Sequence, residues 1–169
     1  MDDVGPEGQK RLLESRALVV GAGGFGSPVI QYLAAAGVGH LTIVDDDVVE
    51  RSNLQRQIVH ADADIGRPKA DSAAEFVADL NPDVDVTTRR TRLTKENVAD
   101  VVSGHDVVID ASDNFPTRYL LNDFCRLEGI PIAHGAIYKF EGQVTTLVPE
   151  GPCYRCLFPE APDPGTVPD

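Results

Sequence analysis

Glycine and aspartate residues near the N-terminus have the spacing of a nucleotide-binding turn. The stretch "ALVVGAGGFGSP", over residues 17–28, follows an apolar run with four glycines: Gly21, Gly23, Gly24 and Gly26. Such glycines allow a tight turn whose backbone N–H groups approach a phosphate at the positive end of the next helix. Asp45 follows about 20 positions on, a spacing that suits hydrogen bonds to ribose hydroxyls. NAD, FAD and ATP all fit this pattern, so the motif alone does not choose among them.

Basic side chains gather in the segment that follows Asp45. In a chain of formal net charge -12, residues 48–70 carry four cations of interest: Arg51, Arg56, Arg67 and Lys69. The glycine turn already meets the two phosphates of NAD, whereas ATP needs further cations to stabilise charge as pyrophosphate leaves. The segment therefore favours ATP. On charge alone, a solvated face whose basic residues pair with nearby acids stays open as the alternative.

The cysteines offer thiols but no disulfide framework, because the chain has only three of them. Cys153 and Cys156 form a CxxC pair, which has the spacing of half a tetrahedral zinc site. Cys125 lies among apolar residues of a predicted helix, and we interpret it as a buried structural thiol. None of the histidines has a ligand spacing with these cysteines: His40, His60, His105 and His134. A zinc site within this sequence is therefore incomplete.

Composition favours one globular domain and excludes two classes of partner. The chain has 169 residues, 42% of them hydrophobic, and 27 acidic against 15 basic residues. An acidic surface repels nucleic-acid backbones and anionic membranes, so we expect neither to be a direct partner. No apolar run approaches the length of a membrane span and the N-terminus lacks the features of a signal peptide, which predicts a cytoplasmic protein. Aspartate outnumbers glutamate and lysine is scarce, which is typical of salt-adapted (halophilic) proteomes, although an ordinary acidic protein is the alternative.

Strand and helix patterns alternate along most of the chain. Helices are predicted over residues 6–15, 26–37, 68–80, 95–102 and 118–128, and strands over 17–20, 41–44, 83–90, 106–111 and 131–135. This alternation predicts an α/β fold: a doubly wound, mostly parallel Rossmann-like sheet with helices on both faces. Residues 136–169 differ, because "FEGQVTTLVP" alternates like an antiparallel strand and "GPCYRCLFPEAPDPGTVPD" is typical of an exposed loop.

Five stretches together resemble one known family. In order, they are "GAGGFGSP", "AAAGVGHLTIVDDDVVERSNLQRQ", "IGRPKA", "DASDN" and "GPCYRC". Their order and spacing are similar to those of the ThiF/MoeB/HesA family, the prokaryotic relatives of ubiquitin-activating enzymes. The resemblance implies a homodimeric enzyme that uses ATP and Mg²⁺ to adenylate the C-terminal glycine of a small ubiquitin-fold protein ending in Gly-Gly. Such MoaD-like or ThiS-like sulphur carriers act in molybdopterin biosynthesis, thiamin biosynthesis or tRNA thiolation.

The resemblance also implies roles for individual residues. The four glycines would line the nucleotide, Asp45 would hold its ribose, and Asn53, Arg56 and Lys69 would contact the triphosphate. Asp113, in "DASDN", would coordinate magnesium and orient the reacting phosphate, so that Arg56, Lys69 and Asp113 form the catalytic set. The other interpretation of Asp113 is an N-terminal cap of the following helix.

The sequence departs from the family pattern at both ends. It lacks the N-terminal arginine segment and, downstream, the crossover loop with its catalytic cysteine and the second CxxC pair. We therefore expect residues 1–169 to be a single ThiF-type nucleotide-binding domain truncated at its C-terminal end. Two alternatives follow: a catalytically incomplete nucleotide-binding subunit, or an NAD-dependent oxidoreductase, for which the sequence offers no convincing hydride-site His or Lys.

Overall fold

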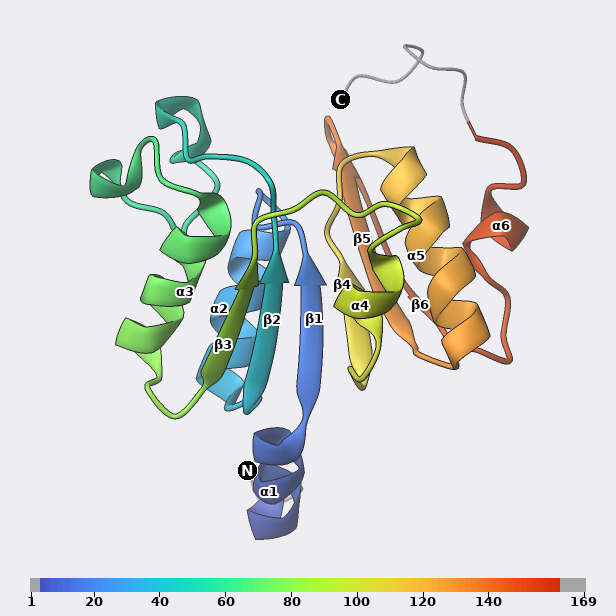
Figure 1. The fold of residues 1–169 in the computed structure, drawn as a ribbon, viewed down its shortest axis with the longest axis horizontal. Coiled ribbons are helices and arrows are strands. Elements are labelled where there is room, and N and C mark those ends of the chain that lie inside the picture. Colours follow the sequence, from blue (N-terminus) through green and yellow to red (C-terminus); the bar gives the residue numbers. More distant parts are fainter. Residues whose placement is uncertain (1–3, 162–169) are drawn as a thin grey trace.

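The strands form one mostly parallel sheet in the computed structural model, which describes residues 4–161 (Figure 1). They are β1 (Arg16–Val20), β2 (His40–Val44), β3 (Asp85–Arg89), β4 (Val107–Asp110), β5 (Ile132–Tyr138) and β6 (Glu141–Leu147). Their order is β3-β2-β1-β4-β5-β6, with β6 antiparallel to β5 and every other pair parallel. The predicted α/β architecture with an antiparallel extension is confirmed.

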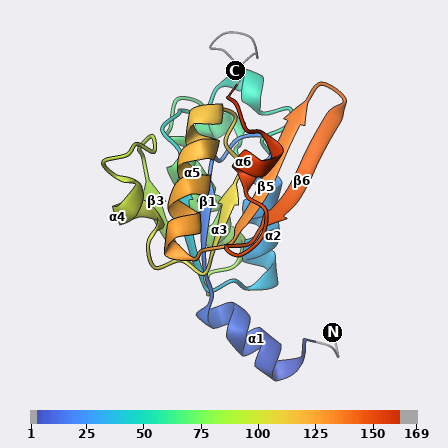
Figure 2. The same ribbon diagram turned by 90° about the vertical axis from the view of Figure 1, so that its right-hand side faces the viewer.

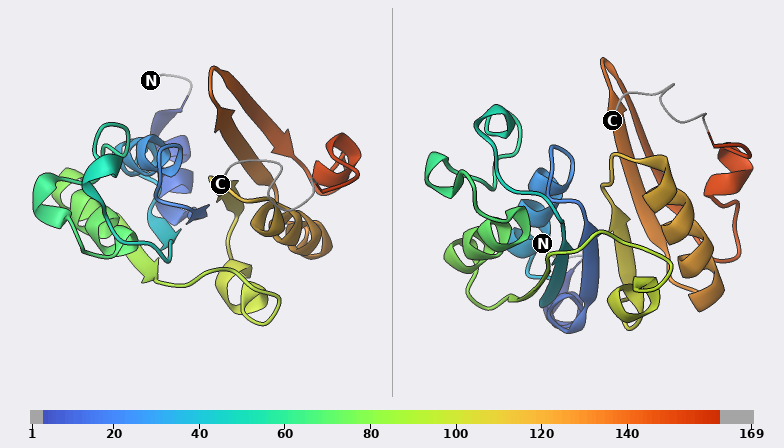
Figure 3. Two further views of the ribbon diagram at one scale, coloured as in Figure 1. Left: turned by 90° about the horizontal axis from the view of Figure 1, so that it is seen from above. Right: turned by 45° about the horizontal axis from the view of Figure 1, so that its top comes forward.

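Helices cover both faces of this sheet (Figure 3). They are α1 (Gly5–Glu14), α2 (Gly26–Ala36), α3 (Lys69–Leu80), α4 (Val98–Val102), α5 (Phe115–Glu128) and α6 (Tyr154–Leu157), with short 3-10 turns η1 (Arg51–Asn53) and η2 (Asp62–Asp64). Helices α2 and α3 lie on one face and α4 and α5 on the other, while α1 extends beyond the sheet (Figure 2). Within residues 4–161, no helix is long and apolar enough to cross a bilayer.

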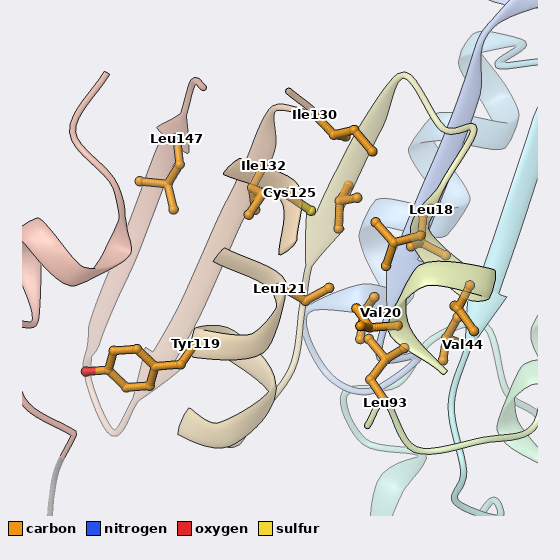
Figure 4. Packing of buried hydrophobic residues seen from close by; sticks show 14 of the residues in the cluster. Leu18, Val20, Val44, Leu93, Tyr119, Leu121, Cys125, Ile130, Ile132 and Leu147 are labelled. Carbon is orange, nitrogen blue, oxygen red and sulfur yellow. The ribbon is translucent and has the colours of Figure 1, made fainter. Parts of the chain in front are cut away.

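Strand β1 is covered on both faces, which explains its continuous apolar sequence. Ala17 and Val19 belong to the core cluster that includes side chains of α2 and α3. Leu18 and Val20 belong to the opposite cluster, under α4 and α5 (Figure 4). Because successive side chains of a strand point to opposite faces, one short apolar run joins both layers.

Several element boundaries differ from the predicted ones, and three of the differences have an identifiable physical cause. Helix α5 begins at Phe115 because the side chain of Asn114 accepts a hydrogen bond from the backbone N–H of Thr117, at 3.0 Å. Strand β5 runs on to Tyr138 because it pairs with β6 along its whole length. The prediction of an exposed loop after residue 150 is wrong at α6, where Tyr154 is buried among aromatic rings. Residues 162–169 of that predicted loop lie outside the described part.

The carboxyl ends of the parallel strands share one edge of the sheet. Strands β1 and β4 are neighbours at the centre of the sheet. The connection after β1 leads to α2 on one face, and the connection after β4 leads to α5 on the other. Ligands of open α/β sheets bind at such a reversal of strand order.

Candidate functional site

A cavity of about 1000 Å³ opens at this edge, between the loops that follow β1, β2 and β4. Most of the predicted site residues line it: Gly21, Gly23, Gly24, Asp45, Asn53, Arg56, Lys69 and Asp113. Gly26 is buried just behind the glycine turn, and Cys153 and Cys156 lie elsewhere. Residues separated by up to 92 positions in the sequence are thus brought to one concave site of small-molecule size.

Three glycines of the turn have different structural roles. Gly21 has φ +98°, a conformation that side chains disfavour. A Cβ on Gly26 would lie 1.8 Å from the carbonyl oxygen of Gly21, so α2 starts directly against the turn. A Cβ on Gly24 would lie 3.2 Å from Nε of Arg56, so this glycine gives the guanidinium room beside the turn. Gly26 therefore has a packing role, whereas Gly24 shapes the cavity wall.

The carboxylate of Asp45 links the end of β2 to the glycine turn. Its two oxygens accept hydrogen bonds from the backbone N–H groups of Ala22, at 2.7 Å, and Asp47, at 2.8 Å. Burial raises the pKa of Asp45 above its ordinary value, against the lowering effect of these two hydrogen bonds. The carboxylate is fixed in the cavity wall, while its contact with a ribose stays a prediction.

Only half of the basic residues in the segment after β2 face the cavity. Arg51 pairs with Asp62 at 2.9 Å and Arg67 pairs with Asp64 at 2.7 Å, as the interpretation of a solvated, charge-paired face expects. Arg56 and Lys69 line the cavity instead. The two interpretations of this segment therefore apply to different residues.

Lys69 is the more constrained of the two cavity cations. Its side chain is 8% exposed, and its Nζ lies 2.8 Å from Oδ2 of Asp47. Arg56 is exposed, and its Nη1 donates only a long hydrogen bond of 3.4 Å to the carbonyl oxygen of Ser52. Asn53 closes η1 with its side-chain oxygen, which accepts from the N–H of Glu50 at 3.1 Å. This wall thus holds one fixed cation and one adjustable cation.

Asp113 faces the cavity from the other side and does not cap α5. The capping side chain is that of Asn114, so the interpretation of Asp113 as the cap is wrong. The carboxylate of Asp113 is exposed, and its Oδ1 accepts a 3.3 Å hydrogen bond from Nδ2 of Asn114. Such a hard oxygen ligand suits Mg²⁺, which prefers a few carboxylates together with substrate phosphates. The donor chemistry of this residue therefore fits the ion that the resemblance implies.

Sequence reasoning missed several residues of the cavity wall. Arg92, Arg118 and Lys139 add cationic side chains from three other loops and elements. Gln57 lines the cavity with its side-chain oxygen buried and without a hydrogen-bond partner among the described residues. The position of Gln57 within "SNLQRQ" was a usable signal, whereas Arg118 belongs to no motif that the sequence analysis used.

The CxxC pair is a separate feature on the turn before and within α6. The two sulfur atoms lie 3.8 Å apart, which is about the spacing of two thiolates in a tetrahedral zinc site with Zn–S of ~2.3 Å. Among residues 4–161, no group of three or more potential metal ligands includes either cysteine. Burial tends to raise the pKa of the Cys153 thiol, but hydrogen bonds from the backbone N–H groups of Cys156 and Arg155 lower it overall. The pair fits half of a zinc site, as predicted from spacing.

The third thiol, that of Cys125, is buried in α5 as predicted. Burial raises its pKa to about 12. Its sulfur lies within the core cluster under α4 and α5 (Figure 4), so the side chain has a packing role.

Comparisons with known proteins agree over the whole chain. Residues 1–169 match the model of the ThiF family. A SAMP-activating enzyme E1 of Haloferax volcanii is 75% identical over 169 residues, which make up 100% of this chain and 63% of the relative. A sulfur carrier protein adenylyltransferase of Thermus thermophilus is 53% identical over 174 residues, covering 99% of this chain and 64% of the relative.

A solved structure has a similar fold. The E. coli tRNA N6-threonylcarbamoyladenosine dehydratase TcdA, in complex with ATP, superposes with a TM-score of 0.76 at 31% identity, covering 82% of this chain and 59% of that one. This chain thus spans less than two thirds of the length of each of these relatives. The chain belongs to the ThiF family.

Proposed function

We propose that this chain carries the nucleotide site of an ATP- and Mg²⁺-dependent adenylyltransferase, which activates the C-terminal glycine of a small ubiquitin-fold protein. The observation that carries the proposal is one cavity with a glycine turn, the fixed cation Lys69 and, on the opposite wall, the exposed carboxylate of Asp113. Two relatives support it by name, as a SAMP-activating enzyme E1 and a sulfur carrier protein adenylyltransferase. TcdA, a relative with the same fold, was solved with ATP.

The proposed reaction suits these residues. A glycine carboxylate is already ionised at neutral pH, so its attack on the α-phosphorus of ATP requires no general base. A bond forms between a carboxylate oxygen and phosphorus, the bond from that phosphorus to the bridging oxygen breaks, and pyrophosphate leaves with the electron pair. Because two anions must approach each other, catalysis rests on positioning and on cationic stabilisation by Arg56 and Lys69.

Magnesium is part of the proposal. Asp113 would hold the ion, which when bound supplies positive charge beside the phosphates. Asp45 would bind the ribose through whichever carboxylate lone pairs the two backbone hydrogen bonds leave available. The backbone N–H groups of Gly23 and Gly24 would receive phosphate oxygens, since that of Gly21 donates to the carbonyl oxygen of Val44 at 2.8 Å.

The alternatives are less well supported. An NAD-dependent oxidoreductase would need a hydride-site His or Lys. No histidine of the described part of the chain lines the cavity, and of the lysines that do, Lys69 pairs with Asp47. The other alternative is a catalytically incomplete nucleotide-binding subunit. That candidate binds ATP but does not turn it over alone.

Partners and assembly are inferred from the same family. We propose a SAMP-type or other sulphur-carrier protein ending in Gly-Gly as the protein substrate, a homodimer as the assembly and the cytoplasm as the location. Zinc would bind Cys153 and Cys156, with two further ligands from outside the described residues. Molybdopterin biosynthesis, thiamin biosynthesis and tRNA thiolation all use such chemistry, and nothing in the cavity separates them.

ATP–pyrophosphate exchange in the presence of a Gly-Gly-ending ubiquitin-fold protein tests the proposal. We expect exchange that requires Mg²⁺ and falls about 100-fold or more in Lys69→Ala, since a cavity cation acts directly on developing charge. Arg51→Ala is the matched control, because it removes a cation of the same segment that pairs with Asp62 at the surface. Equal loss in both variants would overturn the proposed role of Lys69. ATP binding without exchange would favour the incomplete-subunit candidate.

A further inference from the structure

Three buried polar side chains behind the cavity have no role in the proposed function. They are Asp110, the last residue of β4, His134 on β5 and Tyr154 on α6, and each is only 2% exposed. Nδ1 of His134 lies 2.8 Å from Oδ2 of Asp110. The ring of Tyr154 packs edge-on against the imidazole, with 5.0 Å between ring centroids. None of the three lines the cavity.

The other oxygen of Asp110 holds the loop that carries Asp113. Oδ1 accepts hydrogen bonds from the backbone N–H of Ser112, at 3.1 Å, and from its hydroxyl, at 2.6 Å. The carbonyl oxygen of Ser112 accepts from Nη2 of Arg118, at 2.9 Å. The backbone directly before Asp113 is therefore fixed through both of its polar groups, and Ser112 itself lines the cavity.

The chemistry of a buried carboxylate makes His134 part of this arrangement. An ionised carboxylate only accepts hydrogen bonds, so the bond between His134 and Asp110 requires the proton on Nδ1. A buried carboxylate that loses a donor turns toward other partners, and that change alters its bonds to Ser112. The donor from His134 satisfies one oxygen and leaves the other facing the loop.

The imidazole in turn depends on its packing. Its Nε2 is buried and has no hydrogen-bond partner among the described residues. The ring is therefore held by the single bond to Asp110 and by the contact with Tyr154, whose backbone N–H donates to Oδ1 of Asn122 at 2.7 Å. Tyr154 is thus anchored to α5 and closes the space beside the imidazole.

We propose that His134 is a positioning residue of the nucleotide site, which fixes the Asp113 loop through Asp110 and Ser112. Tyr154 keeps the imidazole in the orientation that donates to Asp110. The importance of Asp113 rests on the proposed function, whereas the ordering of its loop by His134 does not. The two ideas therefore fail in different experiments.

Amide hydrogen exchange at Ser112, measured by NMR without nucleotide, tests the ordering step. We expect His134→Ala to raise exchange at this amide about tenfold or more, because the carboxylate that accepts it loses its buried donor. His134→Asn is expected to stay near the unmodified protein, since its amide nitrogen takes a place close to that of Nδ1. His134→Gln keeps more of the volume but moves the donor, and is expected to behave like His134→Ala.

A second histidine serves as the matched control. His105 bridges the carbonyl oxygen of Val102, at 3.0 Å, and Oγ1 of Thr42, at 2.8 Å, and does not line the cavity. His105→Ala should leave Ser112 exchange unchanged while it lowers thermal stability. Unchanged Ser112 exchange in both His134→Ala and His134→Gln, or equal exchange in His134→Asn and His134→Gln, would overturn the inference.

Kinetics extend the test to the site. In ATP–pyrophosphate exchange we expect His134→Ala to lower kcat about tenfold with little change in the KM for ATP, and His134→Asn to restore kcat. A change in stability alone, as in His105→Ala, would contradict positioning. If the unmodified protein shows no ATP–pyrophosphate exchange, the proposed function fails. Hydrogen exchange at the Ser112 amide still tests whether His134 orders the Asp113 loop.

Discussion

The two sides of the cavity are built on different principles. The first side comprises the loops after β1 and β2, and the second comprises the loop after β4 with the start of α5. On the first side two functional side chains are themselves held in place, Asp45 by two backbone N–H groups and Lys69 by Asp47, while Arg56 stays exposed. On the second side the backbone at Ser112 is tied down, while the side chain of Asp113 stays exposed.

This difference matches the chemistry that each side would perform. A cation that neutralises charge during transfer works best when it is already oriented, because no reorganisation is then needed at the moment of reaction. A carboxylate that would take up a metal ion needs free lone pairs, so fixing its backbone positions it without occupying its oxygens. The first side is therefore preorganised in the side chains of Asp45 and Lys69, and the second in its backbone.

The largest expected effect is on the packing of the first side. Gly26→Ala places a Cβ 1.8 Å from the carbonyl oxygen of Gly21, a clash between backbone elements that no side-chain movement relieves. We expect a loss of about 3 kcal/mol or more in the free energy of unfolding, measured with urea. Gly142→Ala is the control, because its Cβ would come no closer than 3.8 Å to a neighbour. Similar losses in both variants would show that the turn does not require this close approach.

On the second side, substitution of Asp113 is predicted to lower activity without lowering stability. Asp113→Asn should lower the rate of ATP–pyrophosphate exchange about 10- to 100-fold and change the free energy of unfolding by less than ~0.5 kcal/mol. The reason is that the exposed carboxylate faces the cavity and caps nothing. A loss of stability without a loss of rate would instead assign Asp113 a structural role.

Substitution of the neighbouring residue, Asn114, is predicted to lower stability more than activity. Asn114→Ala removes the side chain that accepts from Thr117 N–H and should cost about 1 kcal/mol of stability. Asn114→Ala should lower the rate of ATP–pyrophosphate exchange, measured well below the unfolding temperature, less than Asp113→Asn does. If both variants lose rate and stability in the same proportion, the division between cap and cavity carboxylate is wrong.

The smallest expected effect is a pH dependence on the first side. Because burial raises the pKa of Asp45 in the folded state, the folded protein holds this proton more tightly than the unfolded chain does. Asp45 therefore stabilises the folded protein at pH values below the ordinary pKa of an aspartate. This contribution is lost as the pH rises through the raised pKa. Asp45→Asn removes this dependence, together with a pH-independent loss from the changed hydrogen bonds.

Urea unfolding of both proteins at several pH values measures this effect. The stability advantage of the unmodified protein over Asp45→Asn should be greater near pH 3 than at pH 7. Asp46→Asn, which removes the adjacent exposed carboxylate, reports the general effect of one charge. An advantage that grows from pH 3 to pH 7 would contradict the raised pKa.

Much of the fold was predictable because local patterns decide it. The apolar run of β1 must be covered on both faces, and the glycines at positions 21 and 37 mark a turn and a helix end with positive φ. The start of α5 was less predictable, since Asp113 and Asn114 are both good capping residues and geometry selects between them. Burial of Tyr154 depends on Tyr119 of α5 and His134 of β5 as well as on Phe158 directly after α6, and no local pattern reveals the first two contacts.

The site was predictable where it coincides with motifs. The motif residues do line one cavity, yet the motif does not say which cations face it. Arg67, for example, does not line the cavity, because Glu75 on α3 pairs with its guanidinium. His134 and Arg118 support the Asp113 loop from other elements, so their roles appear only when the chain is folded.

Titration calorimetry with Mg-ATP and, separately, with NAD tests the central claim most directly. The claim is that this cavity binds a triphosphate by means of Lys69. At high KCl, Mg-ATP should bind, NAD should give no heat, and Lys69→Ala should weaken Mg-ATP binding at least tenfold while Arg51→Ala does not. Binding of NAD without ATP, or equal ATP affinity in Lys69→Ala and the unmodified protein, would contradict the account.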